Sequence, residues 1–128
     1  WGILSGSVGP RVRLLRNVLS TRSIAVSAPY GLPTGSLTVL SLMAANPGSS
    51  RAALAQRAGI TKSALVGIVD DLERKGLASR DRSSSDRRRN SLSLTDQGRQ
   101  AMEELFARVT REEEDLRQAL GEKDMAQL

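Results

Sequence analysis

The strongest candidate for chemistry is a run of arginines in the second half of the chain. Residues 80–89 contain five Arg and two Asp, a net charge of +3 in ten residues. Neighbouring guanidinium groups repel one another, and salt screens that repulsion only in part. Contact with phosphates, or insertion into a narrow minor groove, relieves the repulsion and releases counterions. The run therefore predicts binding to double-stranded DNA, with a simply solvated loop as the alternative.

A second candidate surface lies just upstream, on a helix predicted to begin after Thr61. Its apolar residues repeat at helical spacing and should be buried: Leu65, Ile68, Val69 and Leu72. The opposite face begins with short, small or basic residues: Lys62, Ser63, Val66 and Gly67. Lys62 can reach a guanine edge or a phosphate, Ser63 can donate or accept a hydrogen bond, and Val66 can touch a thymine methyl. We interpret this face as one that enters the major groove, with an ordinary amphipathic helix as the alternative.

A short helix and a hairpin are predicted to position these two surfaces. Ser49 or Ser50 can cap a helix that ends at Gly59. The turn from there to Thr61 has the length of a helix-turn-helix. Gly76 stands where a left-handed helix cap is expected, and residues 77–82 and 90–94 are predicted to be strands. The arginine run would then form the tip of a basic hairpin.

Longer helices are predicted at both ends of the chain. Gly9-Pro10 opens a first helix with one apolar face, made by Val12, Leu15, Val18, Leu19 and Val26. Thr34 is expected to cap a second helix, which stops at residues 46–48. Thr95 is expected to cap a last helix of some 25 residues, ended by Gly121. So long a helix has no room to bury both ends in a small body, so we expect it to cross to a second copy of the chain.

The composition excludes several classes of protein. The 128 residues fit one domain, and they include no Cys and no His. Disulfides, thiolate zinc sites and cysteine nucleophiles are excluded, and the commonest general base is missing. Lys62 and Ser63 are adjacent on a helix and point about 100° apart, which is poor geometry for a catalytic dyad. We therefore expect no enzymatic activity and no metal site.

The charge balance favours nucleic acid as a partner. The net charge is +5 at pH 7, and only three aromatic residues are present, too few for a single-strand stacking platform. The charge is also uneven: +4 in residues 1–50, +5 in residues 51–100 and −4 in residues 101–128. No apolar stretch approaches the length of a membrane span, so we expect no membrane partner and a cytoplasmic location.

The residues around the predicted hairpin resemble a known family. The segment from Asp86 to Gly98, DRRRNSLSLTDQG, resembles D-x-R-x-x-x-L-x-L-T-x-x-G, the wing signature of the MarR family of transcriptional regulators. Residues 54–63 and 72–80 resemble the family's helix-turn-helix and its junction to the wing. The resemblance runs from about residue 31 to residue 120. It implies a mainly α (α+β) fold, a winged helix-turn-helix with N- and C-terminal dimerisation helices.

The resemblance also implies roles for individual residues. Asp86 corresponds to the acid that braces the wing, and Arg88 to the arginine that enters the minor groove. The recognition-helix face corresponds to Thr61, Lys62, Ser63, Val66 and Gly67. The candidate phosphate contacts are Arg80, Arg82, Arg87 and Arg89. The family implies a homodimer that binds an inverted-repeat operator as a repressor, often released by a small ligand.

The ligand pocket implied by the family lies between the dimer helices and the DNA-binding lobe, near Arg16, Tyr30 and Leu40. The first 50 residues carry four arginines and no acid. We therefore expect no cofactor, but an anionic effector such as an aromatic acid or its acyl-CoA thioester. Alternatively, these arginines are solvated or pair with acidic residues 112–115 of a partner subunit.

Three regions are expected along the chain. Residues 1–33 form an N-terminal helix and linker for dimerisation, and residues 34–95 form the winged helix-turn-helix. Residues 96–128 form a long C-terminal dimerisation helix and the start of a final helix. The predicted function is a sequence-specific, ligand-responsive repressor that binds double-stranded DNA as a homodimer. A winged helix that binds an acidic protein partner is the alternative.

Overall fold

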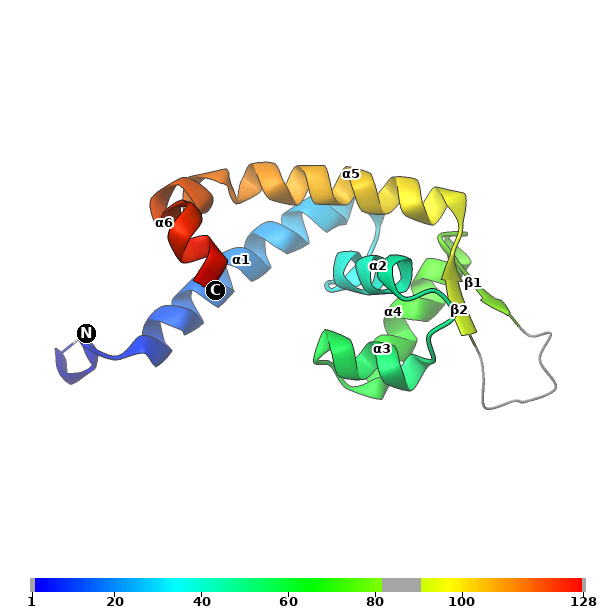
Figure 1. Ribbon diagram of the computed structural model, residues 1–128, viewed down its shortest axis with the longest axis horizontal. Helices are drawn as coiled ribbons and strands as arrows, with labels where there is room; N and C mark the ends of the chain where they lie inside the picture. The colour runs from blue at the N-terminus through cyan, green and yellow to red at the C-terminus, as the bar shows by residue number, and fades with distance from the viewer. Residues whose placement is uncertain (1, 82–90, 128) are drawn as a thin grey trace.

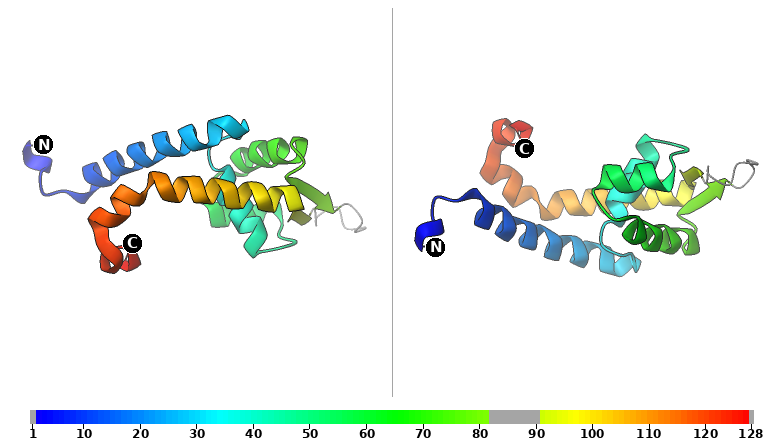
Figure 2. Two further views of the ribbon diagram at one scale, coloured as in Figure 1. Left: turned by 90° about the horizontal axis from the view of Figure 1, so that it is seen from above. Right: turned by 90° about the horizontal axis from the view of Figure 1, so that it is seen from below.

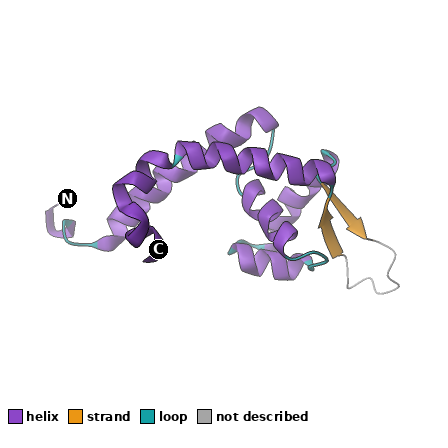
Figure 3. Cartoon of the chain, turned by 45° about the horizontal axis from the view of Figure 1, so that its top comes forward, coloured by secondary structure: helices purple, strands orange, loops and turns teal. Residues whose placement is uncertain are grey.

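Two long helices frame one side of the molecule, and a smaller lobe lies beneath one end of them (Figure 1). The computed structural model describes residues 2–81 and 91–127. The elements, in chain order, are η1 (Gly2–Leu4), α1 (Val8–Ser27), η2 (Ala28–Tyr30), α2 (Ser36–Ala45), α3 (Arg51–Ala58), α4 (Lys62–Arg74), β1 (Ala78–Asp81), β2 (Ser91–Leu94), α5 (Asp96–Glu112) and α6 (Glu114–Gln127). The predicted mainly α fold with one small hairpin is confirmed (Figure 3).

The frame is made by α1 and α5, which pack side by side and run in opposite directions (Figure 2). The first half of α5 continues over α2 and the hairpin, so one helix joins the frame to the smaller lobe. Within residues 2–81 and 91–127, no helix is both long and apolar enough to cross a membrane.

The hydrophobic core lies in the smaller lobe. Its largest fully buried side chains come from five elements: Leu40, Met43, Leu54, Leu65, Leu72, Leu92 and Leu105. The predicted buried row of α4 is confirmed, because all four of its residues belong to this core. The apolar face of α1 is different. Val26 is buried, whereas Val12, Leu15 and Val18 are exposed in the single chain.

Side-chain caps fix the starts of three helices as predicted. The hydroxyls of Ser50, Thr61 and Thr95 each accept a hydrogen bond from the backbone N–H three residues later. The predicted cap at Thr34 is wrong. Helix α2 begins at Ser36, after Gly35 in a left-handed conformation (φ 90°), and no side chain caps it. The Ser36 hydroxyl instead donates to the Pro33 carbonyl, 2.7 Å away.

The predicted single helix of some 25 residues after Thr95 is also wrong. Helix α5 ends at Glu112, and α6 begins two residues later. The break places Glu114 and Asp115 in the first turn of α6. Acidic groups there face the positive end of the helix dipole, whereas in a continuous helix they would lie in its C-terminal half. The predicted stop at Gly121 is confirmed, because its backbone is not helical (φ 74°, ψ 165°) and separates two helical stretches within α6.

The hairpin is antiparallel, and its first strand begins at Ala78, one residue later than predicted. Ala78 pairs with Leu94 and Asp81 with Ser91. The Leu92 N–H also donates to the Ser49 carbonyl, so the segment before α3 lies along the outer edge of β2. The hairpin is therefore attached to the helix-turn-helix from both sides, through the chain that leaves α4 and through this backbone contact.

Candidate nucleic-acid interface

A tight turn joins α3 to α4. Gly59 adopts a left-handed conformation (φ 66°, ψ 30°) that favours glycine. The N–H of the next residue, Ile60, donates back to the Ala55 carbonyl over 3.1 Å. The Thr61 hydroxyl then accepts from the Ala64 N–H over 3.2 Å, which starts α4. This is the helix-turn-helix geometry that the spacing predicted.

The first two turns of α4 present an open surface. Lys62, Ser63 and Gly67 are exposed, and Val66 is half-buried. The Ser63 hydroxyl lies 3.1 Å from that of Thr61, so both hydroxyls face the start of the helix. A Cβ added at Gly67 would meet no atom within 4 Å. The surface is therefore small, polar and unobstructed, as a helix needs to be if it lies against base edges.

Most of the predicted wing residues lie outside the described part of the chain. These are Arg82, Asp86, Arg87, Arg88 and Arg89. The structure describes the two strands on either side of them, from Ala78 to Asp81 and from Ser91 to Leu94. Those two strands belong to the same small lobe as α4.

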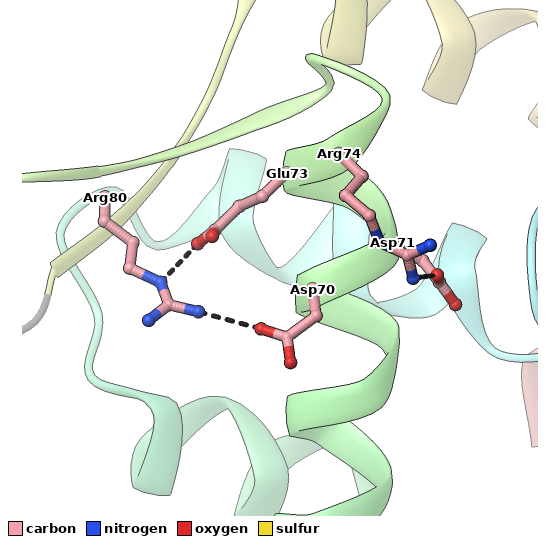
Figure 4. A network of polar contacts seen from close by, with 5 residues as sticks. All are labelled: Asp70, Asp71, Glu73, Arg74 and Arg80. Carbon is pink, nitrogen blue, oxygen red and sulfur yellow. Dashed lines mark hydrogen bonds and ion pairs between the residues drawn. The ribbon is translucent and has the colours of Figure 1, made fainter.

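The wing arginine that the structure does describe, Arg80, contacts the protein itself. Its Nη2 donates to Oδ1 of Asp70 over 2.9 Å, and its Nε donates to Oε1 of Glu73 (Figure 4). Both acids belong to α4, whereas Arg80 belongs to β1. Only 19% of the Arg80 side chain is exposed. Its guanidinium therefore links the hairpin to the helix.

The second half of the signature segment, from Ser91 to Gly98, holds the hairpin and the start of α5 against the end of α4. The Thr95 hydroxyl donates to the Gly76 carbonyl over 2.6 Å and accepts from the Gly98 N–H over 3.0 Å. The Thr95 N–H donates to the Leu77 carbonyl over 3.2 Å. A Cβ at Gly98 would lie only 1.9 Å from that same Leu77 oxygen. Any side chain at position 98 would thus push α5 away from the end of α4.

A groove lies between α1, the start of α2 and the end of α5. It has a volume of about 520 Å³ and is bordered by α1, the segment before α2, the first turn of α2, and the end of α5. Apolar residues on it include Leu15, Leu37 and Val109, and its charged residues are Arg16 and Glu113. Its hydroxyl groups come from Ser20, Ser23, Ser27, Thr34 and Thr38.

The three residues predicted for a ligand pocket have different positions. Arg16 borders the groove. Leu40 is fully buried in the core. Tyr30 lies against α5, where its hydroxyl is 3.3 Å from Oε2 of Glu104 and the Arg108 guanidinium lies 5.3 Å from its ring centre. The structure does not bring these three together around one cavity.

Another arginine of the basic first helix pairs within the same chain. Arg22 donates to both carboxylate oxygens of Asp115, over 2.7 and 2.9 Å, and to the Glu112 carbonyl at the end of α5. The hydrogen bond from Arg22 lowers the pKa of Asp115 from 3.8 to about 2, and the same bond raises the pKa of Arg22. This bidentate pair therefore joins α1 to the α5–α6 junction.

Comparison with known proteins identifies the family. A MarR family model matches residues 30–89. A Thauera aromatica protein proposed as the transcriptional regulator of the hcr operon is 33% identical over 129 residues, covering 99% of this chain and 77% of that protein. The chain belongs to the MarR family of transcriptional regulators.

Two solved structures resemble this MarR protein along nearly its whole length. The repressor CouR bound to a 23-mer DNA duplex has a TM-score of 0.85 and 34% identity, covering 98% of this chain and 89% of that one. CouR from Rhodococcus jostii RHA1 bound to p-coumaroyl-CoA has a TM-score of 0.86 and 26% identity, covering 99% and 90%. These relatives are regulators and not enzymes, and the small molecule in the second structure is a ligand and not a cofactor.

Sequence reasoning missed three connections in this MarR protein. It placed Arg80 among the phosphate contacts without its two acidic partners on α4. It noted Gly98 in the signature but gave it no role, although the signature spacing was itself a signal that position 98 is special. It considered a pairing between basic and acidic helices only across two subunits, whereas Arg22 and Asp115 pair within one.

Proposed function

We propose that this MarR protein is a transcriptional repressor that binds an inverted-repeat operator. In this proposal the face of α4 that begins at Lys62 enters the major groove, and the arginines between residues 82 and 89 contact the flanking minor groove and phosphates. The single observation that carries it is the match, at a TM-score of 0.85 over 98% of the chain, to a repressor bound to a DNA duplex. Because the proposed partner is DNA, we infer a cytoplasmic location.

The repressor is proposed to act as a homodimer. Exposed apolar residues run along the frame of the single chain: Ile3, Leu4, Val8, Val12, Leu14, Leu15, Val18, Ile24 and Phe106. An apolar surface of this extent is unusual for a soluble monomer and marks an interaction site. The apolar notch between α1 and α6, which Leu19 and Leu116 help to line, continues the same surface. A second copy that covers it would present two α4 helices to two half-sites, about one helical turn apart.

Footprinting on DNA selected from random sequence tests this function. We expect two protected half-sites with centres about 34 Å apart. Arg88→Ala should weaken operator binding by about 1–3 kcal/mol if that arginine contacts bases. Lys62→Ala should change sequence preference if the lysine reaches a base edge, and only the salt dependence if it reaches a phosphate. Operator affinity that is unchanged in the Arg88 variant would contradict the wing contact.

The groove beside Arg16 is proposed as the effector site. Its apolar side chains can hold a ring or an acyl chain, and its hydroxyls and Arg16 can orient polar groups. An effector that fits better when the long helices shift relative to α2 would weaken DNA binding, because α5 belongs both to the groove and to the lobe that carries the hairpin.

Calorimetric titration with p-coumaroyl-CoA and with salicylate tests the effector site. Arg16→Ala should reduce uptake of the ligand that binds and its ability to release operator DNA. Arg13→Ala is the matched control, because it removes an equal charge from the same helix at an exposed position that does not border the groove. Equal losses in the two variants would mean that net charge, and not the groove, attracts the ligand.

A further inference from the structure

The recognition helix and the hairpin are joined by one arginine that two acids hold. Asp70 and Glu73 are one turn apart on α4, so their carboxylates face the same side of the helix. Arg80 reaches both from β1, with Nη2 on Asp70 and Nε on Glu73 (Figure 4). Without that guanidinium, two neighbouring carboxylates would repel each other beside the hairpin.

The burial of these groups indicates a fixed contact. The exposed fractions of the Arg80 and Glu73 side chains are 19% and 24%, and that of Asp70 is 49%. Ion pairs between exposed long side chains contribute little to stability, because ordering the side chains costs entropy and water screens their charges. The Arg80 side chain is four-fifths buried and its guanidinium is held at two nitrogens, so the contact is ordered and largely shielded from water.

The charge of this triad argues against a phosphate contact by Arg80. One guanidinium and two carboxylates sum to −1, so the group as a whole repels the DNA backbone. Two of the three guanidinium nitrogens already donate to protein oxygens. A phosphate contact would have to compete with both carboxylates for the same donors.

We propose that Arg80 is a positioning residue for DNA recognition, which fixes the angle between the hairpin and α4 by bridging Asp70 and Glu73. This inference rests on the proposed DNA-binding function. The chain turns between α4 and β1 at Gly76 (φ 70°), close to the end of the helix. Arg80 adds a second attachment farther along the strand, and two attachments resist rotation of the hairpin better than one.

The same helix offers a matched control pair. Arg74 and Asp71 pair on the other side of α4 (Figure 4). They are three residues apart within one helix, and 74% of the Arg74 side chain is exposed. Breaking this pair removes the same kinds of charge from the lobe without releasing the hairpin.

The test measures operator and random-duplex affinity over a range of salt concentrations for Arg80→Gln, Arg80→Lys, Asp70→Asn and Glu73→Gln, with Arg74→Gln and Asp71→Asn as controls. A positioning role predicts that Arg80→Gln, Arg80→Lys and Glu73→Gln each lose about tenfold or more in operator affinity. Lysine keeps the charge but cannot span two carboxylates as the planar fork of arginine does. The salt slope of operator binding should stay as in the wild type, because no phosphate contact is removed.

The acidic variants separate positioning from simple charge. If the triad acted only through its charge, Asp70→Asn and Glu73→Gln would bind both operator and random DNA more tightly. Positioning predicts tighter binding to random DNA but weaker binding to operator, so that the ratio of the two affinities falls. The control variants should leave that ratio unchanged. Tighter operator binding by both acidic variants would overturn the proposal.

A phosphate contact by Arg80 would give a different pattern. Arg80→Lys would then keep wild-type affinity, while Arg80→Gln would reduce the salt slope by about 1. That result would overturn the positioning role while leaving the proposed DNA-binding function intact. If Arg80→Gln does not fold, as judged by circular dichroism, the partly exposed Asp70→Asn variant still decides between the two roles. Failure of the wild type to select any operator would refute the proposed function itself.

Discussion

Replacing Gly98 with alanine should destabilise the protein, although alanine is the better helix former. Gly98 is buried in the first turn of α5, and its backbone is not in the left-handed region. The cost is therefore steric. The added Cβ would lie 1.9 Å from the Leu77 carbonyl oxygen and 3.1 Å from Cδ2 of Leu94. Carbon–oxygen contacts begin at about 3.3 Å, so the start of α5 must move away by roughly 1.4 Å.

That movement strains the contacts made by Thr95. Its N–H donates to the Leu77 carbonyl and its hydroxyl donates to the Gly76 carbonyl. Overpacking costs about 1–3 kcal/mol, and each weakened hydrogen bond adds about 1 kcal/mol. The higher helix propensity of alanine offsets up to about 1 kcal/mol of this loss in stability. We expect a net loss of about 2–4 kcal/mol in the free energy of unfolding, or a melting temperature lower by about 10 °C for a chain of this size.

Thermal unfolding by circular dichroism measures this effect. All variants should be compared at one protomer concentration, because the melting temperature of a dimer depends on it. Gly67→Ala is the control, since Gly67 lies within α4 and an added Cβ would meet open space. That variant should gain about 0.5–1 kcal/mol. A Gly98→Ala protein that melts within about 2 °C of the wild type would refute the steric reasoning, because so small a shift corresponds to less than ~1 kcal/mol.

Other contacts lead to further expectations. Because Arg22 lowers the pKa of Asp115 from 3.8 to about 2, their pair stabilises the fold fully above about pH 4 and loses its effect as the pH falls toward 2. Denaturant midpoints between pH 2 and pH 6 should therefore fall less steeply in Asp115→Asn than in the wild type. Thr95→Val removes a cap and should cost about 1–2 kcal/mol in urea unfolding, whereas Thr110→Val, within α5, should cost less. Alanine at any one of residues 87–89 should reduce the salt slope of operator binding by about 1 if that arginine contacts a phosphate.

The parts of the fold that sequence predicted well depend on short-range chemistry. Ser50, Thr61 and Thr95 cap their helices through hydrogen bonds from N–H groups only three residues away. Gly59 and Gly76 end helices because each adopts a left-handed backbone conformation. The exposed face of α4 could be predicted because its apolar residues, which lie within a few positions of one another, repeat at helical spacing.

The parts that sequence predicted badly depend on contacts between distant segments. The end of α5 is held by Arg22, which reaches the Glu112 carbonyl across 90 positions of the chain. The apolar row is interrupted at Glu112 and Glu113 and resumes at Leu116, but such an interruption does not by itself say that the helix ends there. The positions of Leu40 in the core and of Tyr30 beside α5 met the same difficulty, because sequence does not say which residues of a segment face the core.

The segment that carries the family signature has two parts with different physical roles. From Leu92 onward, its residues contact the protein: Leu92 is buried in the core, Thr95 ties β2 to the end of α4, and Gly98 allows α5 to approach Leu77. The arginines before Asn90 are the part proposed to reach DNA. A variant at Leu92, Thr95 or Gly98 that loses operator binding therefore says little about DNA contact, because misplacing the hairpin has the same effect. Salt slopes and melting temperatures must be measured together, since only a lost phosphate contact lowers the slope while leaving the melting temperature unchanged.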